Sequence, residues 1–189
     1  MQDKVRSIIN STIHISNKSA EKVVGLVKNI NYKKGTLIAS VGQKNNLEYF
    51  VTNGICKSFL TTPEGDDVTI SFFMSKSIIS PSTTRNREGR SLINIRALTD
   101  VEIATMNASA FEKLMVEDLE IRGFGNSVLR NELMAKVQKE IALASLKGKD
   151  RLTLLRKNFP NIENQIPHAD IASYLGITTI SLSRLRSQS

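Results

Sequence analysis

Residues 167–186 read PHADIASYLGITTISLSRLR, and small and apolar residues recur in this stretch at the spacing of two short packed helices. Gly176 suits the left-handed conformation in which a helix ends at a tight turn. A small residue, Ala172, precedes this glycine by four positions, and apolar residues follow it six and nine positions later. This spacing predicts a helix-turn-helix. The residues expected to face inward are Ile171, Ala172, Leu175, Ile177, Leu182 and Leu185.

The second of these helices has an outward face of short polar groups and one arginine. Pro167 suits the first position of the preceding helix, and Thr178 or Thr179 suits the N-cap of the second. The outward positions are Thr179, Ile180, Ser181, Ser183, Arg184 and Ser187. Such groups can reach base edges in a major groove, whereas the solvent-facing helix of an inert domain usually carries more Glu and Lys. We therefore expect this helix to contact double-stranded DNA.

Positive charge is concentrated in the same part of the chain. The whole sequence has a formal net charge of +8. Residues 1–120 hold 15 basic and 13 acidic side chains, whereas residues 121–189 hold 11 basic and 5 acidic ones. A basic segment of this kind is typical of a polyanion-binding face, although many proteins that bind no nucleic acid are mildly basic.

A long helix is predicted ahead of the helix-turn-helix. From about Glu120 to Leu146, apolar residues recur every three or four positions, and Gly148 is a candidate C-cap. The stripe consists of Phe124, Val128, Leu129, Leu133, Val137, Ile141 and Ala144. It suits an interface between two copies of the chain, and part of it must also pack against the preceding domain. We expect a homodimer.

The middle of the chain has the pattern of an antiparallel β-sandwich or barrel, because short β-rich runs alternate with turn residues. The expected strands are residues 36–41, 47–52, 55–61, 68–73, 92–98 and 101–106. The pair Asn53-Gly54 and residues 63–66 predict hairpins.

Shorter helices are predicted on either side of the strands. Residues 5–29 have apolar positions at helical spacing, with Ser19 as a candidate N-cap, and the period changes at Tyr32. After the last strand, Ser109 is a candidate N-cap of a short helix. Residues 150–159 form a further helix that Pro160 ends.

Several classes of protein are excluded by composition. No apolar run approaches the roughly 18 residues of a membrane span, and the N-terminus lacks the apolar core of a signal peptide. Cys56, the single cysteine, cannot form an internal disulfide, which is typical of a cytoplasmic protein, and we expect it to be a buried strand residue. His14 and His168 are far apart in sequence and supply no catalytic or metal-binding cluster. We expect no enzyme activity, cofactor, metal site or membrane contact.

The run IASYLGIT at residues 171–178, followed by LSR at residues 182–184, resembles the C-terminal end of Crp/Fnr-type bacterial regulators, especially the short form common in the Bacteroidetes. Residues 32–106 resemble the family's cyclic-nucleotide-binding β-roll, with turn glycines at Gly42, Gly54 and Gly65. The resemblance covers nearly the whole chain. It implies an α+β fold with three parts: a cyclic-nucleotide-binding-like β-roll (jelly roll), a long dimerisation helix and a C-terminal helix-turn-helix domain.

The resemblance also implies roles for individual residues of the second helix. Thr179, Ile180 and Arg184 occupy the positions that usually reach base edges, and Thr178 and Ser181 occupy phosphate-contacting positions. At Ile180 the well-known relatives have a glutamate that accepts a hydrogen bond from cytosine. The resemblance therefore implies a DNA target different from theirs.

The sensor departs from the family pattern. A Gly-Glu pair that binds ribose and an arginine that binds the cyclic phosphate are replaced by Ser80-Pro81 and Ser91-Leu92. We therefore expect no response to cyclic AMP, and the effector stays open. Arg85, Arg87 and Arg90 form a basic loop that is either a solvated loop or a site for another anion.

The DNA-binding domain departs from the family pattern as well. The family's usual winged DNA-binding domain has a β-hairpin after the second helix, and here the sequence ends at Ser189. We expect the wing to be missing and its phosphate contacts to be lost or made by basic residues elsewhere. The candidates are Lys147, Lys149, Arg151, Arg156 and Lys157.

These inferences divide the chain into a sensor (residues 1–117), a dimerisation helix (118–147) and a helix-turn-helix domain (148–189). They predict a cytoplasmic, dimeric, sequence-specific DNA-binding transcription regulator, with RNA polymerase as a further partner. The alternative is a ligand-binding regulatory β-barrel module that acts through protein partners rather than DNA. A small-barrel (cupin) enzyme would need clustered histidine and carboxylate ligands that the sequence does not supply.

Overall fold

The strands form two antiparallel sheets of four strands each, in a computed structural model that describes residues 2–80 and 84–187. The first sheet has the order β1-β8-β3-β6, with β1(Lys28–Tyr32), β8(Val101–Asn107), β3(Leu47–Asn53) and β6(Ser77–Ile79). The second has the order β2-β7-β4-β5, with β2(Leu37–Ala39), β7(Asn94–Ala97), β4(Cys56–Thr61) and β5(Asp67–Phe73).

Alternating side chains explain why the two sheets pack together. On β3, Tyr49 and Val51 are buried with Ile103 of β8 and with Ile95 of β7 in a core that includes residues of both sheets. Phe50, between them on β3, belongs instead to a core shared with helices. This period of two is that of strands with one face toward each core. The predicted β-sandwich or barrel is confirmed.

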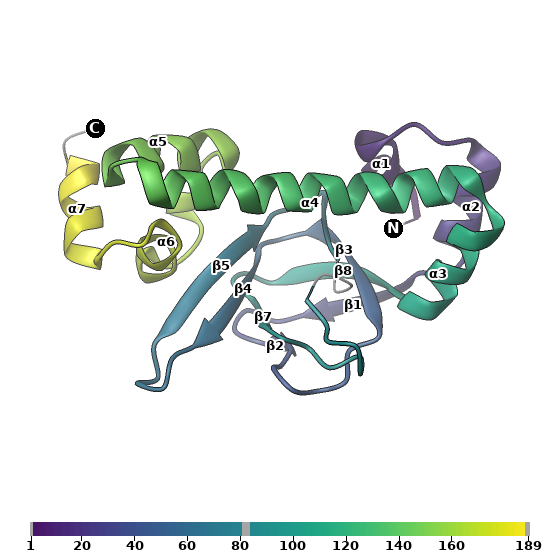
Figure 1. Cartoon of the computed structure of the whole chain (residues 1–189), viewed down its shortest axis with the longest axis horizontal. Coiled ribbons are helices and arrows are strands. Elements are labelled where there is room, and N and C mark those ends of the chain that lie inside the picture. The colour runs from purple at the N-terminus through teal and green to yellow at the C-terminus, as the bar shows by residue number, and fades with distance from the viewer. Residues whose placement is uncertain (1, 81–83, 188–189) are drawn as a thin grey trace.

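One long helix lies along the strands, with shorter helices at both ends (Figure 1). At one end lie α1(Gln2–Thr12), α2(Asn17–Val24) and α3(Ala108–Glu117). The long helix is α4(Leu119–Ser145), 27 residues in length. At the other end lie α5(Gly148–Asn158), α6(His168–Leu175) and α7(Thr179–Ser187), with a 3-10 helix, η2(Ile162–Asn164), between α5 and α6. No helix in the described ranges combines the length and apolar character needed to cross a membrane.

Helix α4 is anchored to the strands at its N-terminal end. The Asp118 side chain caps it by accepting from the N–H groups of Glu120 and Ile121. A hydrogen bond from Lys22 lowers the pKa of Asp118 to about 2, so the cap is ionised at neutral pH and suits the positive end of the helix dipole. One turn further, Phe124 is buried and stacks on Phe50 of β3. The predicted long helix is confirmed within one residue at each end.

The C-terminal helices share a core with the β-strands. Ile55, Phe72 and Leu98, from the strands and their loops, are buried in one cluster with residues of α5, α6 and α7. Phe72 contacts Tyr174 of α6, with ring centroids 5.0 Å apart. Residues 148–187 are therefore packed against the β-strands rather than separated from them.

The N-terminal region differs from the expectation at two points. Ser16, not Ser19, caps α2, since its Oγ accepts from the Ser19 N–H at 3.3 Å. Strand β1 begins at Lys28, before the expected change of period at Tyr32, and pairs with β8. It is an edge strand with mostly exposed side chains, so it lacks the apolar alternation by which strands are recognised.

The expected hairpin at Asn53-Gly54 is wrong. Strands β3 and β4, which flank this pair, belong to different sheets. The turn needs glycine for another reason: Gly54 has a φ of +88°, and a Cβ there would overlap the Asp100 carbonyl oxygen and the Val101 side chain. The hairpin expected at residues 63–66 is confirmed, because β4 and β5 on either side of it pair antiparallel.

Three further details correct the expectation. Asn107, not Ser109, caps α3 by accepting from the Ala110 N–H. Gly148 is the first residue of α5 rather than the C-cap of α4, which is Leu146. Strand β6 was not predicted, since three residues are too few to show a period.

Candidate nucleic-acid interface

Helices α6 and α7 are joined by a tight turn that the sequence specifies locally. Gly176 has a φ of +64°, and the Ile177 N–H donates to the Ala172 carbonyl oxygen at 3.0 Å. This is the Schellman end of a helix, with glycine at its left-handed position. Thr178 then caps α7, since its Oγ1 accepts from the Ser181 N–H at 3.1 Å. Pro167 precedes α6 as its N-cap residue, one position earlier than expected.

The residues expected to face inward do so. Ile171, Ala172, Leu175 and Leu182 are each at most 2% exposed. Ile177 and Leu185 are partly buried against the same cluster. The crossing of α6 and α7 is therefore a packed core, which fixes the outward face of α7.

The outward face of α7 presents the predicted polar groups. Thr178, Thr179, Ile180, Ser183 and Arg184 are exposed, whereas Ser181 is half-buried and bonded to Thr178. Ile180 is 64% exposed, which is unusual for an isoleucine and unexplained by packing within the chain. Within residues 2–80 and 84–187, the Arg184 guanidinium makes no hydrogen bond or ion pair. It is available to a partner.

The other arginine of α7 is engaged inside the domain. Arg186 Nε lies 3.0 Å from Glu163 Oε1, and Arg156 Nε of α5 lies 2.7 Å from Glu163 Oε2. The hydrogen bond from Arg156 holds the pKa of Glu163 below its usual value. His168 adds a contact to Arg186, with 3.2 Å between Nδ1 and Nη1. Arg156 thus joins α5 to η2, and its guanidinium is not a free phosphate donor as expected from the sequence.

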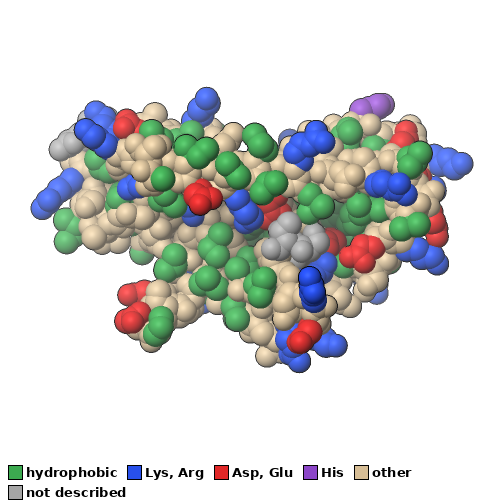
Figure 2. Space-filling view, viewed as in Figure 1, with side chains coloured by type: hydrophobic (Ala, Val, Ile, Leu, Met, Phe, Trp, Pro, Cys, Tyr) green, Lys and Arg blue, Asp and Glu red, His purple; other side chains and the backbone are tan. Residues whose placement is uncertain are grey.

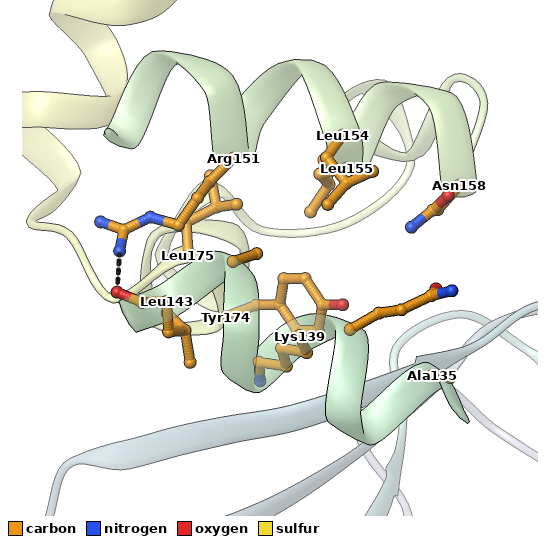
Figure 3. A pocket seen from close by; sticks show the side chains of 11 residues that line it. Ala135, Lys139, Leu143, Arg151, Leu154, Leu155, Asn158, Tyr174 and Leu175 are labelled. Carbon is orange, nitrogen blue, oxygen red and sulfur yellow. Dashed lines mark hydrogen bonds between the residues drawn. The ribbon is translucent and has the colours of Figure 1, made fainter. Parts of the chain in front are cut away.

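Three of the basic residues expected to replace the wing are exposed: Lys147, Lys149 and Lys157. Arg151 instead donates from Nη1 to the Leu143 carbonyl oxygen at 3.2 Å, tying α5 to the end of α4 (Figure 3). Lys and Arg side chains are visible over α5 and α7 at one end of the molecule (Figure 2). No strand follows α7 within the part of the chain that the structure describes.

The apolar stripe expected on α4 divides into two parts. Phe124 is buried and Val128 half-buried against the strands. The C-terminal two thirds of the helix expose a row of large apolar side chains. They are Leu129, Leu133, Met134, Val137, Ile141 and Leu143. In a single copy of the chain this row faces solvent. It includes four of the residues that were expected at a dimer interface, Leu129, Leu133, Val137 and Ile141.

A cluster of polar contacts that the sequence did not reveal fixes α6 against the strands. Lys57 of β4, only 2% exposed, places Nζ 2.6 Å from Asp170 Oδ1 and 2.9 Å from Asp67 Oδ2. Ser173 Oγ donates to the Asp67 carbonyl oxygen and accepts from the Thr69 N–H. The sequence signal of this cluster was a lysine, Lys57, inside a β-rich run. Its partner on α6 is 113 residues away.

Lys139 links α4 to the same place. Its Nζ donates to the carbonyl oxygens of Thr69 and Ile70 and lies 4.0 Å from the centre of the Tyr174 ring. Burial lowers the pKa of Lys139 to about 8. Figure 3 shows Lys139 and Tyr174 side by side, between α4 and α6. Strand β5, the long helix and α6 therefore meet at one point.

The three arginines of the basic loop, Arg85, Arg87 and Arg90, have different surroundings. Arg85 turns inward, and its Nη2 lies 2.9 Å from Glu48 Oε1, while Arg87 and Arg90 are exposed. Ser91 is buried, and its Oγ donates to the Ile93 carbonyl oxygen. Pro81 lies outside the described residues. Among those described, no cluster of three or more His, Cys, Asp or Glu side chains could hold a metal ion.

Comparison with known proteins gives a family match for the β-rich part of the chain. The cyclic nucleotide-binding domain family matches residues 29–118. No curated protein sequence gave a significant match.

Solved structures match nearly the whole chain at low sequence identity. FixK2 from Bradyrhizobium japonicum has a TM-score of 0.73 and 19% identity, covering 86% of this chain and 83% of its own. The c-di-GMP responsive global regulator CLP from Xanthomonas campestris has a TM-score of 0.71 and 14% identity, covering 92% and 91%. A putative transcriptional regulator of the Crp/Fnr family from Eubacterium rectale has a TM-score of 0.68 and 16% identity, covering 90% and 82%. Residues 29–118 therefore match the cyclic nucleotide-binding domain family, and the chain as a whole has the fold of solved structures that include a Crp/Fnr-family transcription regulator.

Proposed function

We propose that this protein is a dimeric, sequence-specific DNA-binding transcription regulator, with α6 and α7 as its helix-turn-helix. The observation that carries the proposal is the exposed Arg184, whose guanidinium has no partner among the described residues, on the outward face of a helix fixed by a buried crossing. A guanidinium in this position can donate to the two acceptors of a guanine in the major groove. Thr179, Ile180 and Ser183 lie beside it, and Thr178 and Ser181 at the start of α7 are suited to phosphate contacts.

The exposed row of apolar side chains on α4 supports dimerisation. An apolar row along a long helix is unfavourable in water, and a second copy of the same helix would bury it. The two copies of α7 would then be related by a two-fold axis, and each would read one half of a palindromic site. The division into sensor (1–117), dimerisation helix (118–147) and DNA-binding domain (148–189) belongs to this proposal.

We infer that cyclic AMP is not the effector. Ser91 stands where the phosphate-binding arginine is expected, and its hydroxyl is buried and bonded to the backbone. Arg85, the nearest inward-facing cation of the loop, is paired with Glu48. Neither side chain is arranged to neutralise a cyclic phosphate.

The phosphate contacts flanking α7 would come from Lys147, Lys149 and Lys157. These lysines are exposed on or next to α5. Gly148, between the first two, lies beside Ile177 and Leu185 of the α6–α7 unit. We further propose that the protein acts in the cytoplasm together with RNA polymerase.

The alternative, a regulatory module that acts through protein partners, predicts no DNA affinity. The deciding experiment incubates the purified protein with fragmented genomic DNA and sequences the retained fragments. We expect enrichment of a two-fold symmetric sequence with half-sites about 10 base pairs apart, or a multiple of that spacing. The affinity for that sequence should fall as salt rises. Retention of no fragment above a control resin would favour the protein-partner alternative.

A further inference from the structure

A cavity of about 200 Å³ lies where α3 and α4 meet the sheet β1-β8-β3-β6. Its walls are mostly apolar and come from three strands and both helices. The apolar lining residues are Phe50, Ile78, Met106, Phe111, Met115, Phe124, Val128 and Leu129. Empty apolar cavities of about 150 Å³ accept a ligand of the size of benzene. This cavity is therefore large enough for a compound of one or two rings.

Gly125 of α4 allows Met115 of α3 to pack directly against the helix in the wall of this cavity. A Cβ at Gly125 would lie 2.6 Å from Met115 Cε. Glycine inside a helix is unfavourable relative to alanine, and here it leaves room beside Met115 and Phe111.

The polar side chains in the wall are two carboxylates and the hydroxyl of Ser80. Glu48 of β3, whose side chain is 9% exposed, lines the cavity together with Glu112 of α3. Arg85 Nη2 donates to Glu48 Oε1 at 2.9 Å. Within residues 2–80 and 84–187, no donor is bonded to Glu48 Oε2, so this atom can accept another hydrogen bond. Burial raises the pKa of Glu48 to about 7, and the charges of Glu112 and Glu132 contribute to the rise.

We propose that this cavity binds an uncharged apolar compound of one or two rings that donates a hydrogen bond to Glu48. Ligand sites are concave and largely apolar, with a few polar groups that orient the ligand, and this cavity has that composition. An anionic ligand is disfavoured because the nearby carboxylates repel it and the only adjacent cation, among the described lining and contact residues, is paired with Glu48. The proposal concerns binding alone and does not depend on whether the chain binds DNA.

Calorimetric titration at pH 8 with three related probes tests the proposal. Indole is uncharged and donates an N–H, 1-methylindole has the same rings without the donor, and indole-3-carboxylate adds a negative charge. We expect indole to bind, 1-methylindole to bind about tenfold more weakly or worse, and indole-3-carboxylate to give no heat of binding. Absence of indole binding, or equal binding of all three probes, would overturn the proposal.

Two variants place the ligand in the cavity. Val128→Phe should fill the space and abolish indole binding while leaving the circular dichroism spectrum unchanged. If that variant does not fold, Glu48→Gln decides: Arg85 would keep the amide oxygen and leave the amide N–H₂ to the ligand, so indole should bind about tenfold more weakly. Glu117→Gln, an exposed position on α3 outside the cavity, is the matched control and should bind indole like the unchanged protein. Equal indole affinity in Glu48→Gln and Glu117→Gln would contradict the assigned role of Glu48.

Discussion

Lys57 Nζ of β4 lies 2.6 Å from Asp170 Oδ1, in the first turn of α6, so the β-strands are joined directly to the first helix of the proposed DNA-binding unit. Both side chains are largely buried, and Asp67 shares the ammonium. A contact of this kind couples the position of α6 to that of β4 and β5. Any change in the strands that moved Lys57 would act on α6 as well.

Replacement of Lys57 should destabilise the whole chain, because Asp170 would be left largely buried without its partner. We expect Lys57→Met to lower the free energy of unfolding by about 1–3 kcal/mol. The matched control is Lys4→Met, which removes an ion pair with Glu102 that is open to solvent, and should cost less than about 1 kcal/mol. Urea denaturation of both variants measures the difference. Equal stabilities would mean that the buried pair makes no net contribution.

Replacement of Gly54, where the chain crosses from one sheet to the other, should cost more stability than replacement of a glycine in an open turn. Gly54 and Gly35 have nearly the same φ, +88° and +87°, but a Cβ at Gly35 has no heavy atom within 4 Å. Gly35→Ala should therefore cost only the backbone strain, about 1–2 kcal/mol. Gly54→Ala adds overlap with Asp100 and Val101, and we expect a further loss of about 1–3 kcal/mol. Thermal denaturation of the two variants would refute this account if Gly54→Ala were the more stable.

The exposed row on α4 should determine the oligomeric state. Leu133→Glu combined with Val137→Glu would bury charge in the proposed interface and should yield monomers. Val116→Glu changes an apolar side chain that is 75% exposed at the end of α3, outside the row, and should leave the dimer intact. Sedimentation velocity at micromolar concentration distinguishes these states. If the unchanged protein sediments as a monomer, the proposed homodimer is wrong.

Glu48 should make stability depend on pH between about 4.5 and 7. Burial raises the pKa of Glu48 from 4.5 to about 7 in the folded protein, so in this window the folded chain keeps a proton that the unfolded chain has lost. The free energy of unfolding should then fall as pH rises through the window. Glu48→Gln removes this contribution, so the stability of the unchanged protein relative to this variant should decrease from pH 4.5 to pH 7. A difference that stays constant, or increases, over this range would show that the Glu48 pKa is not raised.

The features of the fold that could be predicted from the sequence are those set by neighbours in the chain. The turn at Gly176, the cap at Thr178 and the period of α4 depend on residues within a few positions of one another. Strand β1 could not be recognised, because an edge strand with exposed side chains has no apolar alternation.

The features that could not be predicted depend on contacts between distant segments. The link between Lys57 and Asp170 spans 113 residues, and the need for glycine at position 54 arises from Asp100 across the fold. The surroundings of Arg85 depend on a distant residue in the same way. Arg85 donates to Glu48, which lies 37 residues earlier in the sequence.

The base-reading role of Arg184 can be separated from simple charge attraction by a matched pair of variants. Arg184→Ala should reduce discrimination against the wrong base by about 1–3 kcal/mol. Lys149→Ala removes an exposed charge of α5 and should weaken binding to all DNA sequences alike. The slope of log affinity against log salt concentration should become shallower by about one unit. Arg156 is unsuitable as this control, since its loss would also free Glu163.

The most direct measurement is the ratio of affinities for the selected sequence and for a random duplex, determined by fluorescence anisotropy over a range of salt for the unchanged protein and both variants. We predict that Arg184→Ala narrows this ratio by about tenfold or more, whereas Lys149→Ala leaves it nearly unchanged. Equal losses of affinity on both duplexes in the Arg184→Ala variant would contradict the account, because Arg184 would then contact only the DNA backbone.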